Sequence, residues 1–168
     1  MTHPRSIFLL FLLGILLTPN ARPARAQDRS LGRLATLVNE ADAIVLGTCE
    51  SAVSTWDEHH HFIVTRSTVR TRRQFKGMTD ETVTVQTLGG TIGDEGMVAS
   101  HGASLRQGEP AVLFLKRSQY GPYFVIWGGE DGKLQVEESP SGAAVIGAGT
   151  PMDLDSFAAW VEATGRQP

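Results

Sequence analysis

The fold is decided by residues 62–90, which read FIVTRSTVRTRRQFKGMTDETVTVQTLGG. Up to residue 75, the odd positions form a mostly apolar, β-branched face, with Ile63, Thr65, Val69 and Phe75. The even positions form a polar face, with Arg66, Thr68, Arg70, Arg72 and Gln74. Valines alternate with polar residues in the same way over 82–86. A period of two residues is typical of a strand with one buried and one solvated face. The stretch therefore predicts two strands with a turn at Lys76-Gly77 between them.

Further strands are expected at 43–53, 110–116, 123–127 and 133–138, where apolar runs stand between turn signals. Gly47 inside the first of these predicts a bulge or sharp bend. The run at 110–116 is almost continuously apolar, which predicts that both of its faces are covered. Five glycines between residues 89 and 102 argue against a helix there, and one short extended piece is expected at 96–100.

A helix is expected at each end of this all-β domain. Leucines recur at three- and four-residue spacing after Ser30, which predicts a helix over 30–39 capped by that serine. Asp153 predicts the start of a second helix over 154–163, and Gly165 predicts its end. Residues 139–151, before the second helix, are expected to form a loop.

The first 26 residues predict a secretory signal peptide. His3 and Arg5 precede an apolar run of 11 residues, IFLLFLLGILL, and Ala24-Arg25-Ala26 offers a cleavage site. The alternative is a retained membrane anchor, but 11 residues are too few to span a bilayer. Cleavage after Ala26 would leave one domain, residues 27–168, in the periplasm or outside the cell and without a membrane attachment.

The mature chain is acidic. Residues 1–26 hold three of the 15 lysines and arginines and none of the 18 acidic residues, so cleavage changes the net charge from −3 to −6. An acidic surface disfavours nucleic-acid binding, which depends on an excess of basic side chains. The single cysteine, Cys49, has no partner for an intramolecular disulfide, and its place in an expected strand favours a buried thiol over a reactive one.

Short motifs in a fixed order resemble a known family. They are Ala-Asp-Ala-Ile-Val-Leu-Gly-Thr at 41–48, Trp-Asp at 56–57, Ile-Val-Thr at 63–65, Phe-Lys-Gly at 75–77, Gly-Glu-Pro-Ala-Val-Leu-Phe-Leu at 108–115 and Trp-Gly-Gly at 127–129. Over about 31–136 the chain resembles an exported bacterial β-barrel module that occurs alone or beside matrixin-type metalloproteases. That module is similar in architecture to the netrin-like, OB-type barrel of the tissue inhibitors of metalloproteinases. The resemblance implies a small OB-like antiparallel barrel of five to six strands flanked by the two helices, and a protein partner such as a secreted protease.

The inhibitory mechanism of those proteins does not carry over. The animal inhibitors chelate the zinc of their target through an N-terminal cysteine, whereas the mature chain is expected to begin at Gln27 and its one cysteine is Cys49. The chain also lacks the His-Glu-x-x-His motif of the neighbouring proteases and the Gly-x-Ser-x-Gly motif of serine hydrolases. A protein-binding module without enzymatic activity is therefore expected.

Metal binding is the alternative function. His59-His60-His61 follows two acidic residues, and His59 and His61 project to the same side if the strand has already begun. Imidazole and carboxylate ligands suit zinc, copper or nickel, and His101 is the third candidate ligand. The other interpretation is a polar loop, because three adjacent histidines cannot all face one ion. No other cofactor is expected.

Three arginines form a candidate partner surface. Arg66, Arg70 and Arg72 share the polar face of the strand within 62–75. One interpretation is a docking surface for an acidic partner, or for single-stranded nucleic acid on a barrel face, although the acidic charge of the chain disfavours the nucleic acid. The other is a solvated strand whose arginines pair with carboxylates of the same domain.

Overall fold

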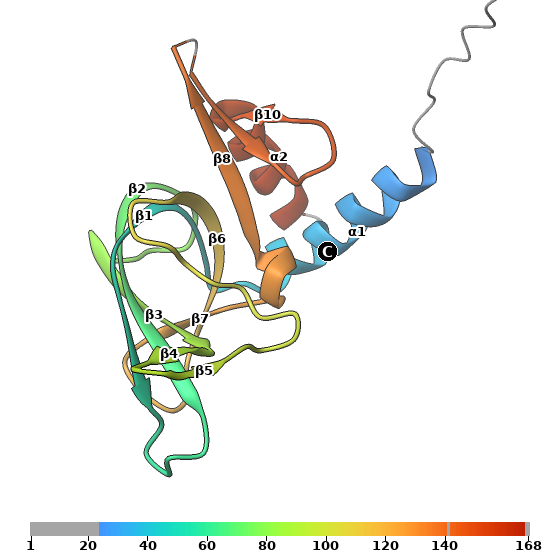
Figure 1. The fold of residues 1–168 in the computed structure, drawn as a ribbon. Coiled ribbons are helices and arrows are strands. Elements are labelled where there is room, and N and C mark those ends of the chain that lie inside the picture. Colours follow the sequence, from blue (N-terminus) through green and yellow to red (C-terminus); the bar gives the residue numbers. More distant parts are fainter. Residues whose placement is uncertain (1–23, 141, 167–168) are drawn as a thin grey trace, which may run out of the picture.

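The computed structural model describes residues 24–140 and 142–166. Five of its strands form a closed barrel, in the order β1-β2-β3-β7-β6, and pairing of β6 with β1 closes the ring (Figure 1). The strands are β1 (Ala43–Trp56), β2 (Ile63–Lys76), β3 (Thr82–Leu88), β6 (Pro110–Arg117) and β7 (Phe124–Ile126). A closed barrel of five strands is consistent with an OB-like fold.

One pair of barrel strands is parallel. β3 and β7 run in the same direction and pair through Val85 and Gln86, whereas the other four pairs are antiparallel. The expectation of a purely antiparallel barrel is wrong at this point. Strand directions cannot alternate all the way around a closed ring with an odd number of strands, so at least one pair has to be parallel.

The strands expected from the alternating pattern are confirmed. In β2 the side chains of Ile63, Ser67 and Val69 are buried and those of Arg66 and Arg70 are exposed. β1 is three residues longer than expected and continues to Trp56. The pairing of β1 with β2 shifts register between Leu46 and Gly47, which confirms the bulge. A side chain at Gly47 would collide with Val69, so the bulge brings the two strands very close.

A second layer lies outside the barrel (Figure 1). β8 (Lys133–Ser139) pairs with β6, β9 (Gly142–Ile146) pairs with β8, and β10 (Met152–Asp153) pairs with β9. The expectation of a loop over 139–151 is therefore wrong. The Gly- and Ala-rich sequence of β9 has a weak intrinsic preference for a strand, and its pairing with β8 builds the strand instead.

Two helices complete this layer, α1 (Ala24–Glu40) and α2 (Leu154–Gly165). α1 begins before Ser30, so that residue lies within the helix and not at its start. α2 begins as expected, because a carboxylate oxygen of Asp153 accepts hydrogen bonds from the backbone N–H groups of Asp155 and Ser156. The expected signal peptide, residues 1–26, lies almost entirely outside the described residues.

Alternate residues of β1 and β6 face two separate hydrophobic cores. The inner core fills the barrel and contains Val45, Cys49, Val69, Val85, Leu113 and Phe124. The outer core lies between the barrel wall, the strands β8 and β9, and the helices, and contains Leu34, Val38, Ile44, Leu46, Phe114, Leu134 and Phe157. Five consecutive residues of β6 are buried, which confirms that both of its faces are covered.

The connection from β3 to β6 has no helix in the described chain, as expected. It contains a small hairpin of β4 (Gly90–Ile92) and β5 (Glu95–Met97), which overlaps the short extended piece expected at 96–100. The connection from β7 to β8 includes a short 3-10 helix, η1 (Gly129–Gly132).

Candidate interaction surface

The loop between β1 and β2 is held by one carboxylate. An oxygen of Asp57 accepts hydrogen bonds from the backbone N–H groups of His61 and Phe62, at 2.6 and 2.9 Å. The hydrogen bond from Phe62 is the main cause that lowers the pKa of Asp57. His60 has a φ of 56°, in the left-handed region that loop residues adopt. The loop is therefore a defined turn with its own hydrogen bonds.

Three histidines project from this loop, and the candidate metal ligands are only partly brought together. The ring centroids of His59 and His61 lie 6.0 Å apart, and His60 stacks on Trp56 at 6.3 Å. His101 lies in the connection between β5 and β6, where its carbonyl accepts a hydrogen bond from the Glu130 N–H. Within residues 24–140 and 142–166 no group of three or more His, Cys, Asp or Glu side chains is arranged to hold a metal ion. The metal site therefore stays a prediction, based on the neighbouring rings of His59 and His61.

The arginines of β2 already have partners in the chain. Arg70 contacts the carboxylates of Glu50 and Glu81, and its hydrogen bond to Glu50 raises its pKa. Arg72 pairs with Glu138 of β8. These pairs correspond to the interpretation of a solvated strand that neutralises the carboxylates of its own domain.

Arg66 is different. It donates from Nε to the neutral side chain of Gln86, at 3.2 Å, and has no carboxylate partner among the described residues. It pairs across the sheet with Val53 of β1, which is 59% exposed. Of the three arginines, Arg66 is therefore the one available to a partner.

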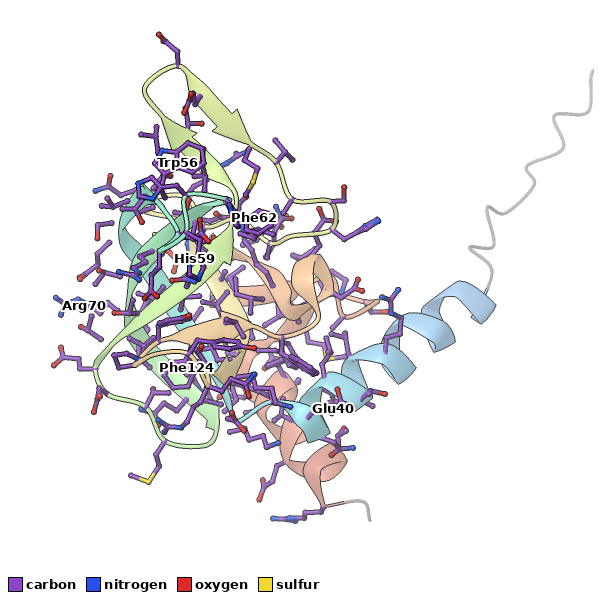
Figure 2. The ribbon with its side chains drawn as sticks, turned by 90° about the horizontal axis from the view of Figure 1, so that it is seen from below. Glu40, Trp56, His59, Phe62, Arg70 and Phe124 are labelled. Carbon is purple, nitrogen blue, oxygen red and sulfur yellow. The ribbon has the colours of Figure 1, made fainter. Side chains whose placement is uncertain are left out.

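Large apolar side chains are exposed around the same end of the barrel. This set, the tip patch, consists of Val53, Trp56, Phe62, Leu88 and Val98. The strand register brings Val53 and Leu88 together on one face, because Val64 pairs with Leu88 on one side and with Thr55, two residues after Val53, on the other. Trp56 and Phe62 stand at the two ends of the adjoining β1–β2 loop. Figure 2 shows Trp56 and Phe62 beside His59 at this end of the molecule. Exposed apolar residues that gather in one place are typical of interaction sites.

A groove of about 560 Å³ opens beside the tip patch. Its lining includes Ala52 and Ser54 of β1, Leu88 and Val98 of the patch, and Leu105. Glu130 is the one charged side chain among the residues that line it. The groove is thus a mainly neutral depression with an acidic end.

One edge of β1 faces this groove and pairs with no strand of the described residues. β6 pairs with β1 only up to Thr48, whereas β2 pairs with it to Trp56. Asp57 donates its backbone N–H to Phe62, and hydrogen-bonded pairs alternate along an antiparallel ladder. Ala52, Ser54 and Trp56 therefore direct their backbone N–H and C=O groups away from β2. An open edge of this kind can accept an additional strand.

Cys49 takes no part in this surface. Its side chain is 2% exposed within the inner core, and burial raises the pKa of the thiol. The expectation of a buried thiol is confirmed.

Sequence reasoning missed the tip patch. Val53, Leu88 and Val98 stand far apart in the sequence, and each reads as an ordinary strand or loop residue. The signal that leads to Val53 and Leu88 is the pairing register, since residues that pair across strands share one face of a sheet.

No protein-family model and no curated protein matches the chain. Among the helices of the described residues, none has the length and apolar character needed to cross a membrane.

Proposed function

We propose that the chain is an exported binding module that acts by protein–protein interaction and has no enzymatic activity of its own. The tip patch is the observation that supports this best. The exposed area of its five side chains faces water in the free chain, whereas a partner that covers it would remove apolar area from solvent, which is favourable.

Polar groups around the patch could make specific contacts with such a partner. Arg66 offers an uncompensated positive charge at its side, and the open edge of β1 offers backbone donors and acceptors. In OB-folds the loop between the first two strands is part of the ligand-binding surface. The partner in this proposal is a secreted protein, and a secreted protease is the candidate that the family resemblance supplies.

The test compares capture by matched variants. The purified chain is immobilised and exposed to the extracellular and cell-envelope proteins of the producing organism. We expect a protein retained by the wild type to be lost by the double variant Val53→Ser plus Phe62→Ser. Met78→Ser is the matched control, because Met78 is 85% exposed in the β2–β3 turn at the other end of β2. Equal retention by the double variant would contradict the proposal.

Metal binding is the second candidate function, favoured by the adjacent rings of His59 and His61. Calorimetric titration with zinc, copper and nickel, after treatment with a chelator, measures it. Sub-micromolar binding of about one ion per chain would support this candidate. His59→Ala plus His61→Ala would abolish it. His101→Ala decides whether the third predicted ligand contributes, and unchanged affinity in the double variant would remove this candidate.

A further inference from the structure

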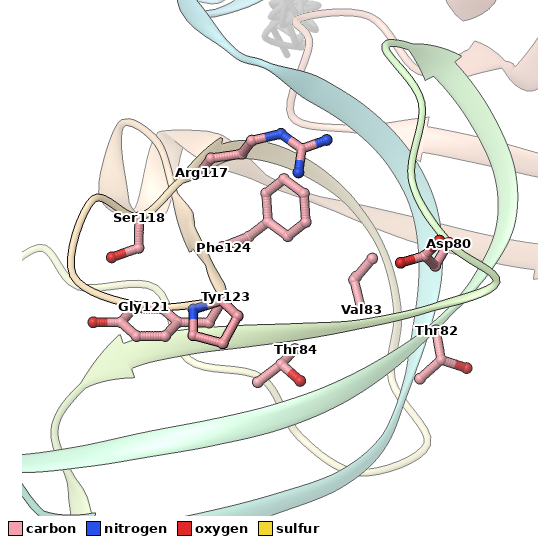
Figure 3. Close-up of a pocket in the computed structure, with 10 residues that line it drawn as sticks. Asp80, Thr82, Val83, Thr84, Arg117, Ser118, Gly121, Tyr123 and Phe124 are labelled. Carbon is pink, nitrogen blue, oxygen red and sulfur yellow. The ribbon is translucent and has the colours of Figure 1, made fainter.

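A second pocket lies at the opposite end of β3 from the tip patch (Figure 3). Its volume is about 440 Å³. The start of β3 forms one side of the pocket. The hairpin loop between β6 and β7 forms the other side, and Tyr123 and Phe124 stand where this loop leads into β7. The pocket occupies the place in the barrel wall where β3 and β7 have not yet begun to pair.

The backbone of β3 is unpaired along this pocket. β7 pairs with β3 only at Val85 and Gln86. Thr71 donates its N–H to Glu81, which fixes the alternation of hydrogen bonds between β2 and β3. The N–H and C=O of Thr82 and the N–H of Thr84 therefore point away from β2 and into the pocket. These groups match the backbone of an extended peptide.

Charges of opposite sign stand on the two sides of the pocket. Arg117 is exposed, and its guanidinium carbon lies 5.1 Å from the centroid of the Phe124 ring. Within the described chain this guanidinium forms no ion pair. Asp80 lies on the other side, beyond Val83 (Figure 3). A ligand complementary to both would place an anionic group at Arg117 and a cationic group near Asp80.

The end of the free edge and the position of Arg117 together favour one orientation of such a ligand. β7 occupies the same edge of β3 from Val85 onward, so a strand added along Thr82 and Thr84 has to stop where Phe124 begins. A peptide parallel to β3 has its carboxyl end at this point, beside Arg117. Arginine is suited to a carboxylate because its planar fork donates two parallel hydrogen bonds.

We propose that this pocket binds the carboxyl terminus of an extended peptide from a partner protein, added to β3 as a short parallel strand. Arg117 holds the terminal carboxylate, Thr82 and Thr84 hydrogen-bond the peptide backbone, and Asp80 selects a basic residue upstream of the terminus. The site is separate from the tip patch and does not depend on the proposed function of that patch.

The experiment uses a pool of N-acetylated hexapeptides of random sequence, prepared once with a free carboxyl terminus and once as the amide. Each pool is passed over the immobilised chain, and retained peptides are measured by mass spectrometry. Because a hydrogen bond to a charged group is worth considerably more than a neutral one, we expect the carboxylate pool to be retained at least about tenfold better than the amide pool. Retained sequences should be enriched in Lys and Arg upstream of the terminus.

Matched variants tie the effect to the pocket. Arg117→Gln should retain both pools equally, and Asp80→Asn should keep the preference for a carboxylate but lose the enrichment in basic residues. Arg106→Gln is the control, because Arg106 is also an exposed arginine outside any ion pair of the described residues. In NMR spectra the retained peptides should shift the amide signals of Thr82 and Thr84.

Three results would overturn the proposal: equal retention of the two pools by the wild type, an unchanged preference in Arg117→Gln, or amide shifts elsewhere than at the start of β3. Circular dichroism of each variant separates loss of the site from loss of the fold. The variant Val53→Ser plus Phe62→Ser should retain the peptides as the wild type does, so that failure of the tip proposal leaves this result unaffected.

Discussion

The two halves of β1 have opposite surroundings. In residues 43–49 every residue except Thr48 is buried, whereas no residue of 50–56 is buried. The first half pairs with β2 and β6 and lies between the two cores, while the second half pairs with β2 alone. One strand thus stabilises the domain with its first half and contributes Val53 and Trp56 to the tip patch with its second. Changes in the first half should affect stability, and changes in the second should affect binding.

The largest effect is expected in the outer core, which covers the first half of β1. Phe157 is fully buried and contacts Phe75 edge to face, with ring centroids 5.0 Å apart. Phe157→Ala should lower the free energy of unfolding by about 3–5 kcal/mol, because it leaves a large cavity. Chemical denaturation measures this loss. Tyr120→Ala, at a side chain 83% exposed, is the control, and a loss no larger than that of the control would contradict the role of the outer core.

A smaller effect is expected at the turn that packs against the start of β1. Gly77 has a φ of 70°, and a Cβ there would collide with the carbonyl oxygen of Asp42. Gly77→Ala should cost about 1–3 kcal/mol of unfolding free energy, from strain and this contact together. Gly93 has a similar φ of 58° with open space around it, so Gly93→Ala measures the strain alone. Equal losses in the two variants would show that the contact with Asp42 is unimportant.

Acid should lower the stability of the fold through two aspartates, Asp153 at the start of α2 and Asp57 in the β1–β2 loop. Hydrogen bonds from Ser156 lower the pKa of Asp153, and those from Phe62 and His61 lower that of Asp57. A carboxylate with a lowered pKa in the folded state adds stability above its unfolded pKa, near 3.8, and this stability is lost as the pH falls through the folded value. The melting temperature should therefore fall below about pH 4.

The aspartates can be separated by substitution. Asparagine caps a helix about as well as aspartate but does not titrate in this range. Asp153→Asn should thus keep most of the stability at neutral pH and fall less steeply in acid, by thermal denaturation. If the melting temperature of Asp153→Asn fell as steeply in acid as that of the wild type, the cap of α2 would not contribute to the acid sensitivity.

The smallest effect on stability is expected in the tip patch itself. Val53→Ser and Phe62→Ser remove apolar side chains that are 59% and 51% exposed. Each should change the free energy of unfolding by no more than about 0.5 kcal/mol, although the pair should abolish partner binding. Denaturation curves measure the first expectation. A loss comparable with that of Phe157→Ala would show that these residues belong to the structural core and not to an interaction surface.

Local patterns were enough to predict most of the barrel. Alternation located β2 and β3, the apolar run located β6, and Asp153 located the start of α2, because each signal depends on neighbouring residues. β9 and the parallel pair of β3 with β7 depend on contacts between distant segments, and the sequence pattern carries no such information. The candidate sites show the same limit. His59 and Arg66 were visible as residue types, whereas the tip patch and the pocket at Arg117 arise from strand register.

Hydrogen exchange along β1, measured by mass spectrometry on the free chain and on the chain bound to its captured partner, tests the division of this strand most directly. We expect the amides of residues 43–49 to exchange slowly in both states, because they open only with the whole domain. Amides of residues 50–56 should exchange faster in the free chain and slow down on binding. Uniform protection along β1 in the free chain, or slowing confined to α1 and α2, would contradict this division of the strand.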